Sequence, residues 1–155
     1  MRPREVIRLS NDAFDAATVC NGWQLVELLT AIEGLHPNLS WYVADVQTLG
    51  PSPTRRREPC PTSIGHTAAL IQAVGDVVQF ESGVFVGVPS GIEQPAFRPG
   101  GLWTEDDETE DLGDAVIEMR AFDTSYWSIA TADPDIARDL LERFAANGRG
   151  RRDPI

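Results

Sequence analysis

The polar side chains best suited to bind a ligand gather around one predicted turn. They are Glu118, Arg120, Asp123, Ser125 and Tyr126. An arginine flanked by carboxylates and a tyrosine hydroxyl can bind an anionic ligand or a loop of a partner protein. The same residues have a structural interpretation, which we favour: Arg120 pairs with Glu118 or Asp123, while Asp123 and Ser125 bond to amides of the turn.

Asp45 is a further candidate residue, and it lies in a second predicted strand, Trp41 to Leu49 (WYVADVQTL). A carboxylate within an apolar strand usually points to solvent or lies on an edge strand. The alternative is that Asp45 shares a polar site with the turn residues. That site, for a small ligand or a substrate, would comprise Asp45, Glu118, Arg120, Asp123 and Tyr126.

A further candidate site is the acidic segment that follows Trp103. Its carboxylates are Glu105, Asp106, Asp107, Glu108, Glu110 and Asp111. A calcium loop of the EF-hand kind requires glycine at its sixth position. Counted from Asp107 that position is Leu112, so we predict no metal site here. We predict instead that Trp103 and these carboxylates contact a basic protein, because opposite charge speeds encounter and an aromatic side chain anchors contacts.

Other catalytic arrangements are not indicated. The histidines, His36 and His66, stand in no spacing that selects a pair with Cys20 or Cys60. No phosphate-binding glycine loop, zinc-peptidase motif or serine-hydrolase motif occurs. The sequence therefore predicts no catalytic residue, no cofactor and no metal, and it favours a protein that is not an enzyme.

Length and composition are those of one globular domain. The chain has 155 residues, of which 42% are hydrophobic and 24% charged. We predict a single domain over residues 1–148 and a basic, frayed tail over residues 149–155. We expect no signal peptide and no membrane span. The two cysteines lack CxxC spacing and suggest reduced thiols, which favours a cytoplasmic location.

The net charge of −11 limits the classes of partner, and all 13 basic residues are arginine. Such acidity disfavours nucleic-acid binding, which depends on positive surface. It suits a basic protein partner, although acidity also simply aids solubility. Three consecutive arginines, Arg55 to Arg57, lie in a proline-rich segment over residues 50–62. We interpret this segment as a solvated loop that can fold back on the acidic segment.

The element that positions the first set of candidates is a hairpin over residues 115–131 (AVIEMRAFDTSYWSIAT). A three-residue loop at 123–125 pairs Phe122 with Tyr126 and Ala121 with Trp127. One face is then apolar, because strand side chains alternate. That face comprises Ile117, Met119, Ala121, Trp127 and Ile129. A two-residue loop would put Trp127 on the polar face, so the pattern favours the three-residue loop.

The remaining elements follow from caps and periodicity. Glu5 to Leu9 reads as a strand, and residues 84–88 as a central strand that is covered on both faces. The other predictions are a helix from N-cap Asn21 to terminator Gly34, a helix over Ile64 to Val74 capped by Ser63, a hairpin that turns at 81–83, and a last helix from Asp133 to near Gly148. The mixed order predicts an α+β fold, with an antiparallel or mixed sheet of about five to six strands and two to three helices packed on it.

Several segments resemble small stand-alone bacterial proteins: Gly22-Trp23 followed by LVELL, then WYVADV, QFESGVF and EMRAFDTSYWSI. In size, acidity and α+β composition such proteins are similar to the immunity proteins that are encoded beside toxins. The resemblance implies a binding function toward a basic toxin or nuclease. It assigns no role to any individual residue.

Overall fold

The computed structural model describes residues 5–50, 58–106 and 111–144, and the backbone of residues 151–154. Within these residues, seven strands form one sheet in the order β3-β2-β4-β5-β6-β1-β7, and every neighbouring pair is antiparallel. The strands are β1 (Glu5–Leu9), β2 (Leu39–Leu49), β3 (Thr62–His66), β4 (Gln79–Pro89), β5 (Ile117–Phe122), β6 (Tyr126–Thr131) and β7 (Arg151–Pro154).

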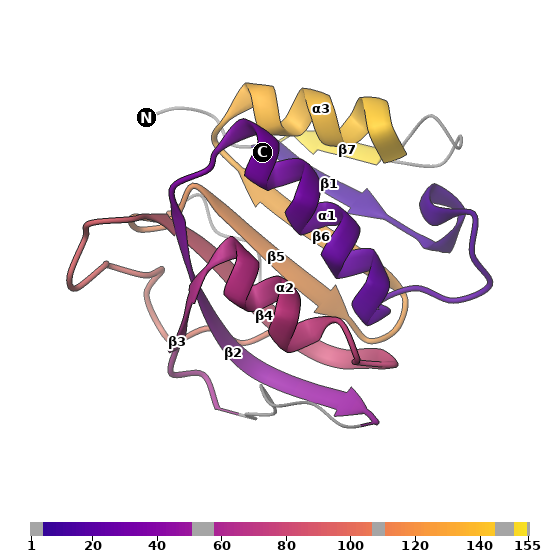
Figure 1. Cartoon of the computed structure of the whole chain (residues 1–155), viewed down its shortest axis with the longest axis horizontal. Helices are drawn as coiled ribbons and strands as arrows, with labels where there is room; N and C mark the ends of the chain where they lie inside the picture. Colours follow the sequence, from indigo (N-terminus) through magenta and orange to yellow (C-terminus); the bar gives the residue numbers. More distant parts are fainter. Residues whose placement is uncertain (1–4, 51–57, 107–110, 145–150, 155) are drawn as a thin grey trace.

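Three α-helices cover one face of this sheet (Figure 1). They are α1 (Gly22–Leu35), α2 (Thr67–Val74) and α3 (Pro134–Phe144), and a short 3-10 helix, η1 (Asn11–Phe14), precedes α1. The predicted α+β class is confirmed. The main hydrophobic core lies between these helices and the sheet, where it buries Trp41, Phe85 and Trp127 completely.

The hairpin of β5 and β6 has the predicted register. Phe122 pairs with Tyr126, and Ala121 pairs with Trp127. Asp123 and Thr124 take the left-handed conformation, with φ of 48° and 55°, which closes the three-residue loop without a glycine. The predicted apolar face is fully buried in the main core, namely Ile117, Met119, Ala121, Trp127 and Ile129.

Helix α1 begins at the predicted capping box. The backbone N–H of Asn21 donates to Gln24 Oε1 at 3.0 Å. The predicted terminator is wrong by a residue, because α1 passes through Gly34 to Leu35 and its C-cap is His36. The helix stops there because Pro37 disfavours helical backbone at the residue before it.

The second face of the sheet is covered by the long connection between β4 and β5. Leu102 from this connection packs on Ala44, Val84, Val86 and Val88. Residues 84–88 are therefore buried from both sides, as predicted for a central strand. Glu118, Arg120 and Ser128 of β5 and β6 lie on this second face, because they alternate with the side chains in the main core.

Strand β4 corrects the hairpin predicted at residues 81–83. A single strand runs from Gln79 to Pro89 and contains Gly83. A Cβ added at Gly83 would lie 2.8 Å from the ring of Phe85. This glycine therefore makes room for an aromatic ring within a strand and does not form a turn.

Two further predictions are corrected by strand pairing. Ser63 does not cap a helix, because it lies in β3 and pairs with Tyr42 of β2, and α2 begins only at Thr67. Within the tail predicted to be frayed, residues 151–154 form β7 and pair with β1. Backbone pairing with an exposed strand edge needs no apolar pattern, so no periodicity indicated it.

Candidate functional site

A buried ion network lies on the second face of the sheet. Glu118 is held between two arginines: Arg98 Nε donates to Oε1 at 2.8 Å, and Arg120 Nη2 donates to Oε2 at 3.3 Å. Arg98 also pairs with Asp106, with 3.0 Å between Nη1 and Oδ2. Glu118, Arg98 and Arg120 are all buried. Each charge in the network thus has an opposite charge beside it, as burial requires.

The arginines fasten a stretch of loop that we call the covering segment, residues 102–106. Arg98 Nη2 donates to the Trp103 carbonyl at 2.9 Å, and Arg120 Nη1 donates to the Asp106 carbonyl at 2.6 Å. Arg98 belongs to the same long connection as the covering segment. Of the two arginines that hold the covering segment, Arg98 therefore comes from the same connection and Arg120 comes from β5.

Thr104 ties the covering segment to three strands. Its N–H donates to Asp45 Oδ2 of β2 at 3.0 Å, and its hydroxyl accepts from the N–H of Gly83 of β4 at 3.0 Å. Its carbonyl accepts from Arg120 Nη1 of β5 at 3.3 Å. With 1% of its surface exposed, Thr104 has its polar groups satisfied by the sheet that it covers.

Two β-bulges shape the sheet beside the covering segment. β2 carries an extra residue where Asp45 and Val46 stand opposite Gly83, and β4 carries an extra residue at Glu81. Asp45 has a φ of 50°. A bulge redirects a side chain that regular pleating would place elsewhere. Here the bulges bring the carboxylates of Asp45 and Glu81 to one cleft.

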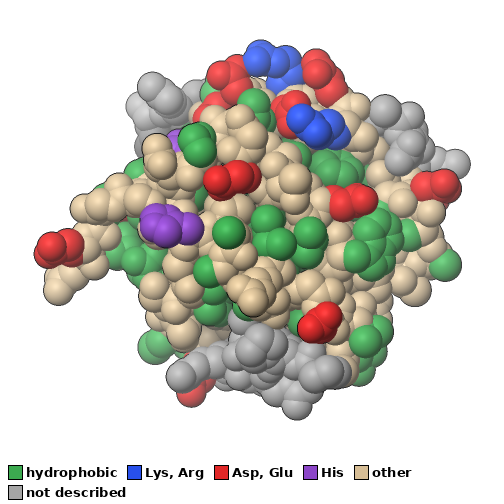
Figure 2. Space-filling view, in the orientation of Figure 1, with side chains coloured by type: hydrophobic (Ala, Val, Ile, Leu, Met, Phe, Trp, Pro, Cys, Tyr) green, Lys and Arg blue, Asp and Glu red, His purple; other side chains and the backbone are tan. Residues whose placement is uncertain are grey.

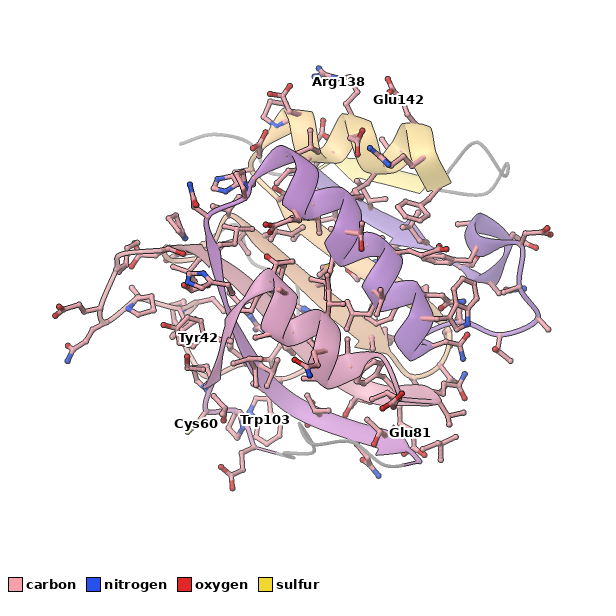
Figure 3. The ribbon with its side chains drawn as sticks, in the orientation of Figure 1. Tyr42, Cys60, Glu81, Trp103, Arg138 and Glu142 are labelled. Atoms are coloured by element: carbon pink, nitrogen blue, oxygen red, sulfur yellow. The ribbon has the colours of Figure 1, made fainter. Side chains whose placement is uncertain are left out.

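This acidic cleft has a volume of about 520 Å³. Its lining residues in the described part of the chain are Asp45, Gln47, Glu81, Ser82, Trp103, Thr104, Glu105, Asp106 and Asp123. Five of them carry carboxylates and none is basic. Asp106 is the one lining carboxylate that the described residues pair with an arginine. The Trp103 side chain is 38% exposed at the cleft, and Figure 3 shows Trp103 and Glu81 near β2, at the lower edge of the view.

A smaller cleft of about 310 Å³ shares Glu105 and Asp106 of the covering segment with the acidic cleft. Its lining residues are Arg8, Glu105, Asp106, Arg120, Phe122, Tyr126 and Ser128. The guanidinium carbon of Arg8 lies 5.2 Å from the centre of the Tyr126 ring, and Phe122 stacks on Tyr126 at 5.0 Å. Arg8, Tyr126 and Phe122 thus contact one another, whereas the Arg120 guanidinium is bonded to Glu118 and to the covering segment.

The two predicted residue sets meet in the structure. From the acidic segment, Trp103, Glu105 and Asp106 line the acidic cleft, and they are joined there by Asp45 and Asp123 from the predicted ligand site. Asp111 lies outside the cleft, where its Oδ1 accepts from the N–H of Gly113 at 2.8 Å. Asp107, Glu108 and Glu110 lie outside the described residues, as do Arg55, Arg56 and Arg57.

The predicted ligand site is not one pocket. Asp45 and Asp123 line the acidic cleft, whereas Arg120 and Tyr126 line the smaller one. Glu118 lines neither cleft, because it is buried between Arg98 and Arg120. Arg120 therefore pairs with Glu118, as the structural interpretation of these residues predicted.

The sequence did not indicate several site residues, among them Arg98, Thr104 and Glu81. A signal existed for Arg98, since it is the only arginine between Arg57 and Arg120 and the chain has no lysine, and a buried carboxylate needs an opposite charge nearby. Thr104 and Glu81 had no such signal. Their positions depend on a loop-to-sheet contact and on a bulge, and neither changes the local composition.

Among the hydrogen bonds of the described residues, none joins a cysteine to a histidine. Cys20 is buried, its thiol donates to the Tyr126 carbonyl at 3.3 Å, and burial raises its pKa to about 12. Cys60 is exposed. Among the described residues, no group of three or more His, Cys, Asp or Glu side chains is arranged to hold a metal ion, and no helix is long and apolar enough to cross a membrane.

Comparison with known protein families, curated proteins and solved structures gave no significant match.

Proposed function

We propose that this chain is a non-enzymatic binding protein that docks a basic protein through the acidic cleft. The proposal extends to the role of an immunity or inhibitor protein, in which the partner is a basic toxin or nuclease of a bacterium. A cytoplasmic location is part of the proposal, and two cysteines without a disulfide support it.

The observation that carries the proposal is the convergence of carboxylates on one concave surface. Asp45, Glu81, Glu105 and Asp123 come from β2, β4, the long connection and the hairpin loop. No described residue forms an ion pair with any of these four carboxylates. The negative electrostatic potential of these carboxylates attracts a positively charged partner and raises the rate at which it associates. Trp103 adds an aromatic surface of the kind that anchors protein interfaces.

The alternative is a small-ligand site or an enzyme around Asp45, Glu118, Arg120 and Tyr126. It receives less support, because Glu118 and Arg120 satisfy each other and are buried beneath the covering segment. A reacting group has to reach its substrate. Glu118 lines neither cleft, and the guanidinium of Arg120, although it lines the smaller cleft, is bonded to Glu118 and to carbonyls of the covering segment.

The test compares two variants of equal charge. The cleft variant carries Glu81→Gln, Glu105→Gln and Asp123→Asn. The control variant carries Glu27→Gln, Glu33→Gln and Glu142→Gln, which removes three exposed carboxylates from the helix-covered face. Carboxylates on that face are scattered (Figure 2), so the control changes the net charge equally without touching the cleft.

The measurement is recovery of proteins from a lysate of the source organism at low and at moderate salt. We expect the native chain and the control variant to retain the same basic protein at low salt and to lose it as salt rises. The cleft variant should lose it at both. Equal recovery by both variants, or binding that does not weaken with salt, would contradict docking through the acidic cleft.

A further inference from the structure

We propose that the acidic cleft is a pocket for an arginine side chain of the partner, with Asp45 as the carboxylate that receives the guanidinium. This inference rests on the proposed function and names the chemistry of the group that enters the cleft. It begins from Asp45, which is 7% exposed and lines the cleft.

Asp45 differs from the other buried carboxylate of this sheet face. Glu118 has a guanidinium on each of its two oxygens. The carboxylate of Asp45 accepts a single hydrogen bond from the described residues, from the N–H of Thr104 to Oδ2, and forms no ion pair with them. A buried carboxylate is costly without an opposite charge. Oδ1 of Asp45 accepts no hydrogen bond from the described residues, and Asp45 lines the acidic cleft, so this oxygen can accept from a group that enters it.

The covering segment already binds guanidinium groups of this chain. On its sheet side, carbonyls of Trp103, Thr104 and Asp106 accept from Arg98 or Arg120. Glu105 and Asp106 of the same segment also line the acidic cleft, together with Asp45 and Glu81. This short segment thus supplies both backbone and side-chain oxygens as acceptors.

A guanidinium fits such a wall better than an ammonium group does. Guanidinium presents five N–H donors in a planar fork and stacks on aromatic rings, whereas the lysine ammonium is a compact and strongly hydrated charge. The carboxylates of the acidic cleft come from four separate segments, and Trp103 is the aromatic residue among its described lining residues. The volume of about 520 Å³ lies within the usual range for pockets that enclose an organic group, about 300–1,000 Å³.

The experiment titrates the full chain with three blocked tripeptides, acetyl-Gly-Arg-Gly-amide and its lysine and citrulline counterparts. Binding is followed by the indole N–H signal of Trp103, assigned with Trp103→Phe, and by the amide signal of Thr104. We expect saturable shifts of both signals with the arginine peptide. Affinity should be about tenfold lower or weaker still for citrulline, which lacks the charge, and lower for lysine than for arginine. Equal binding of the arginine and lysine peptides would overturn the assignment.

Asp45→Asn is the decisive variant, because asparagine keeps an oxygen that can accept from Thr104, whereas it removes the charge and replaces the other oxygen with an NH2 donor. We expect it to fold and to bind the arginine peptide about tenfold more weakly. If it does not fold, Glu105→Gln at the exposed rim replaces it, with the same expected direction. Unchanged binding by the folded variant would contradict the role of that carboxylate.

Two outcomes separate this inference from the proposed function and from a metabolite site. If the cleft variant loses the basic protein while no tripeptide binds, docking stands and the arginine pocket is wrong. If free L-arginine binds more tightly than the blocked peptide, the cleft takes a small molecule and the assignment to a partner's side chain is wrong.

Discussion

Glu118 and Asp45 are buried carboxylates on neighbouring parts of one sheet face, and they differ in the charge of the groups that hydrogen-bond to them. Glu118 has Arg98 and Arg120 beside it, and Asp45 has the backbone N–H of Thr104. The Arg120 partner could be predicted, since both residues lie on one face of a strand two positions apart. Arg98 could not be placed, because twenty positions separate it from Glu118 and only the folded connection brings them together.

The buried thiol of Cys20 gives a prediction at the same scale. Since burial raises its pKa to about 12, the folded chain retains a proton that an unfolded cysteine releases near pH 8.5. A raised pKa of this kind means that the free energy of unfolding falls as the pH rises from about 8.5 to 12. Cys20→Ser should remove this part of the alkaline decline, measured by urea unfolding at several pH values.

A thiol-reactive reagent provides the control for that prediction. At pH 8 the exposed Cys60 should react rapidly in the native chain, and Cys20 should react only on unfolding. Fast modification of two thiols in the native chain, or an alkaline decline that Cys20→Ser leaves unchanged, would show that Cys20 is not protected as described.

At the scale of elements, α1 contains two glycines with opposite surroundings. A Cβ at Gly22 would lie 2.4 Å from the carbonyl oxygens of both Val74 and Val77, whereas a Cβ at Gly34 would meet nothing within 4 Å. We expect Gly22→Ala to lower the free energy of unfolding by about 1–3 kcal/mol through overpacking. Gly34→Ala should raise it by about 0.5–1 kcal/mol, because alanine is the better helix former.

Urea denaturation of the two variants measures this difference. The substitution is the same and lies in the same helix, so intrinsic propensity alone predicts a similar gain at both positions. A gain at Gly22 comparable to that at Gly34 would mean that α1 does not approach the end of α2 as closely as the structure places it.

Regular elements were predictable, and their irregularities were not. The β5–β6 register followed from alternation and loop length, because a slip of one residue would have put Trp127 on the polar face. The bulges at Asp45 and Glu81 left no trace in composition, and Gly83 has the residue type of a turn although it lies within a strand. These irregularities shape the acidic cleft, so the sequence predicted several of its residues without predicting the cleft itself.

At the scale of the whole molecule, the net charge of −11 means that the carboxylates repel one another. This repulsion should be strongest in the acidic cleft, where five carboxylates lie close together. Added sodium chloride screens the charges, so we expect the melting temperature to rise by about 2–4 °C for each kcal/mol of repulsion removed. The cleft variant should start from a higher melting temperature and gain less from salt than the control variant. Thermal unfolding followed by circular dichroism measures all three proteins.

Identical salt responses of the cleft and control variants would contradict a local concentration of charge in the cleft. The two variants have the same formal charge, so a difference between them reports where the charge was removed. This measurement needs no partner, and its result is independent of the binding experiments.

The lining residues of the acidic cleft range from residue 45 to residue 123, and they are brought together by the pairing of β2, β4 and β5 and by the contacts of Thr104 and the two arginines. A synthetic peptide that copies the acidic stretch would reproduce its charge without Asp45, Glu81 or Asp123. If the proposed docking is right, we expect such a peptide to compete poorly with the native chain. The acidic cleft is a discontinuous surface, so the docking proposed for it could be transferred to another scaffold only together with the sheet.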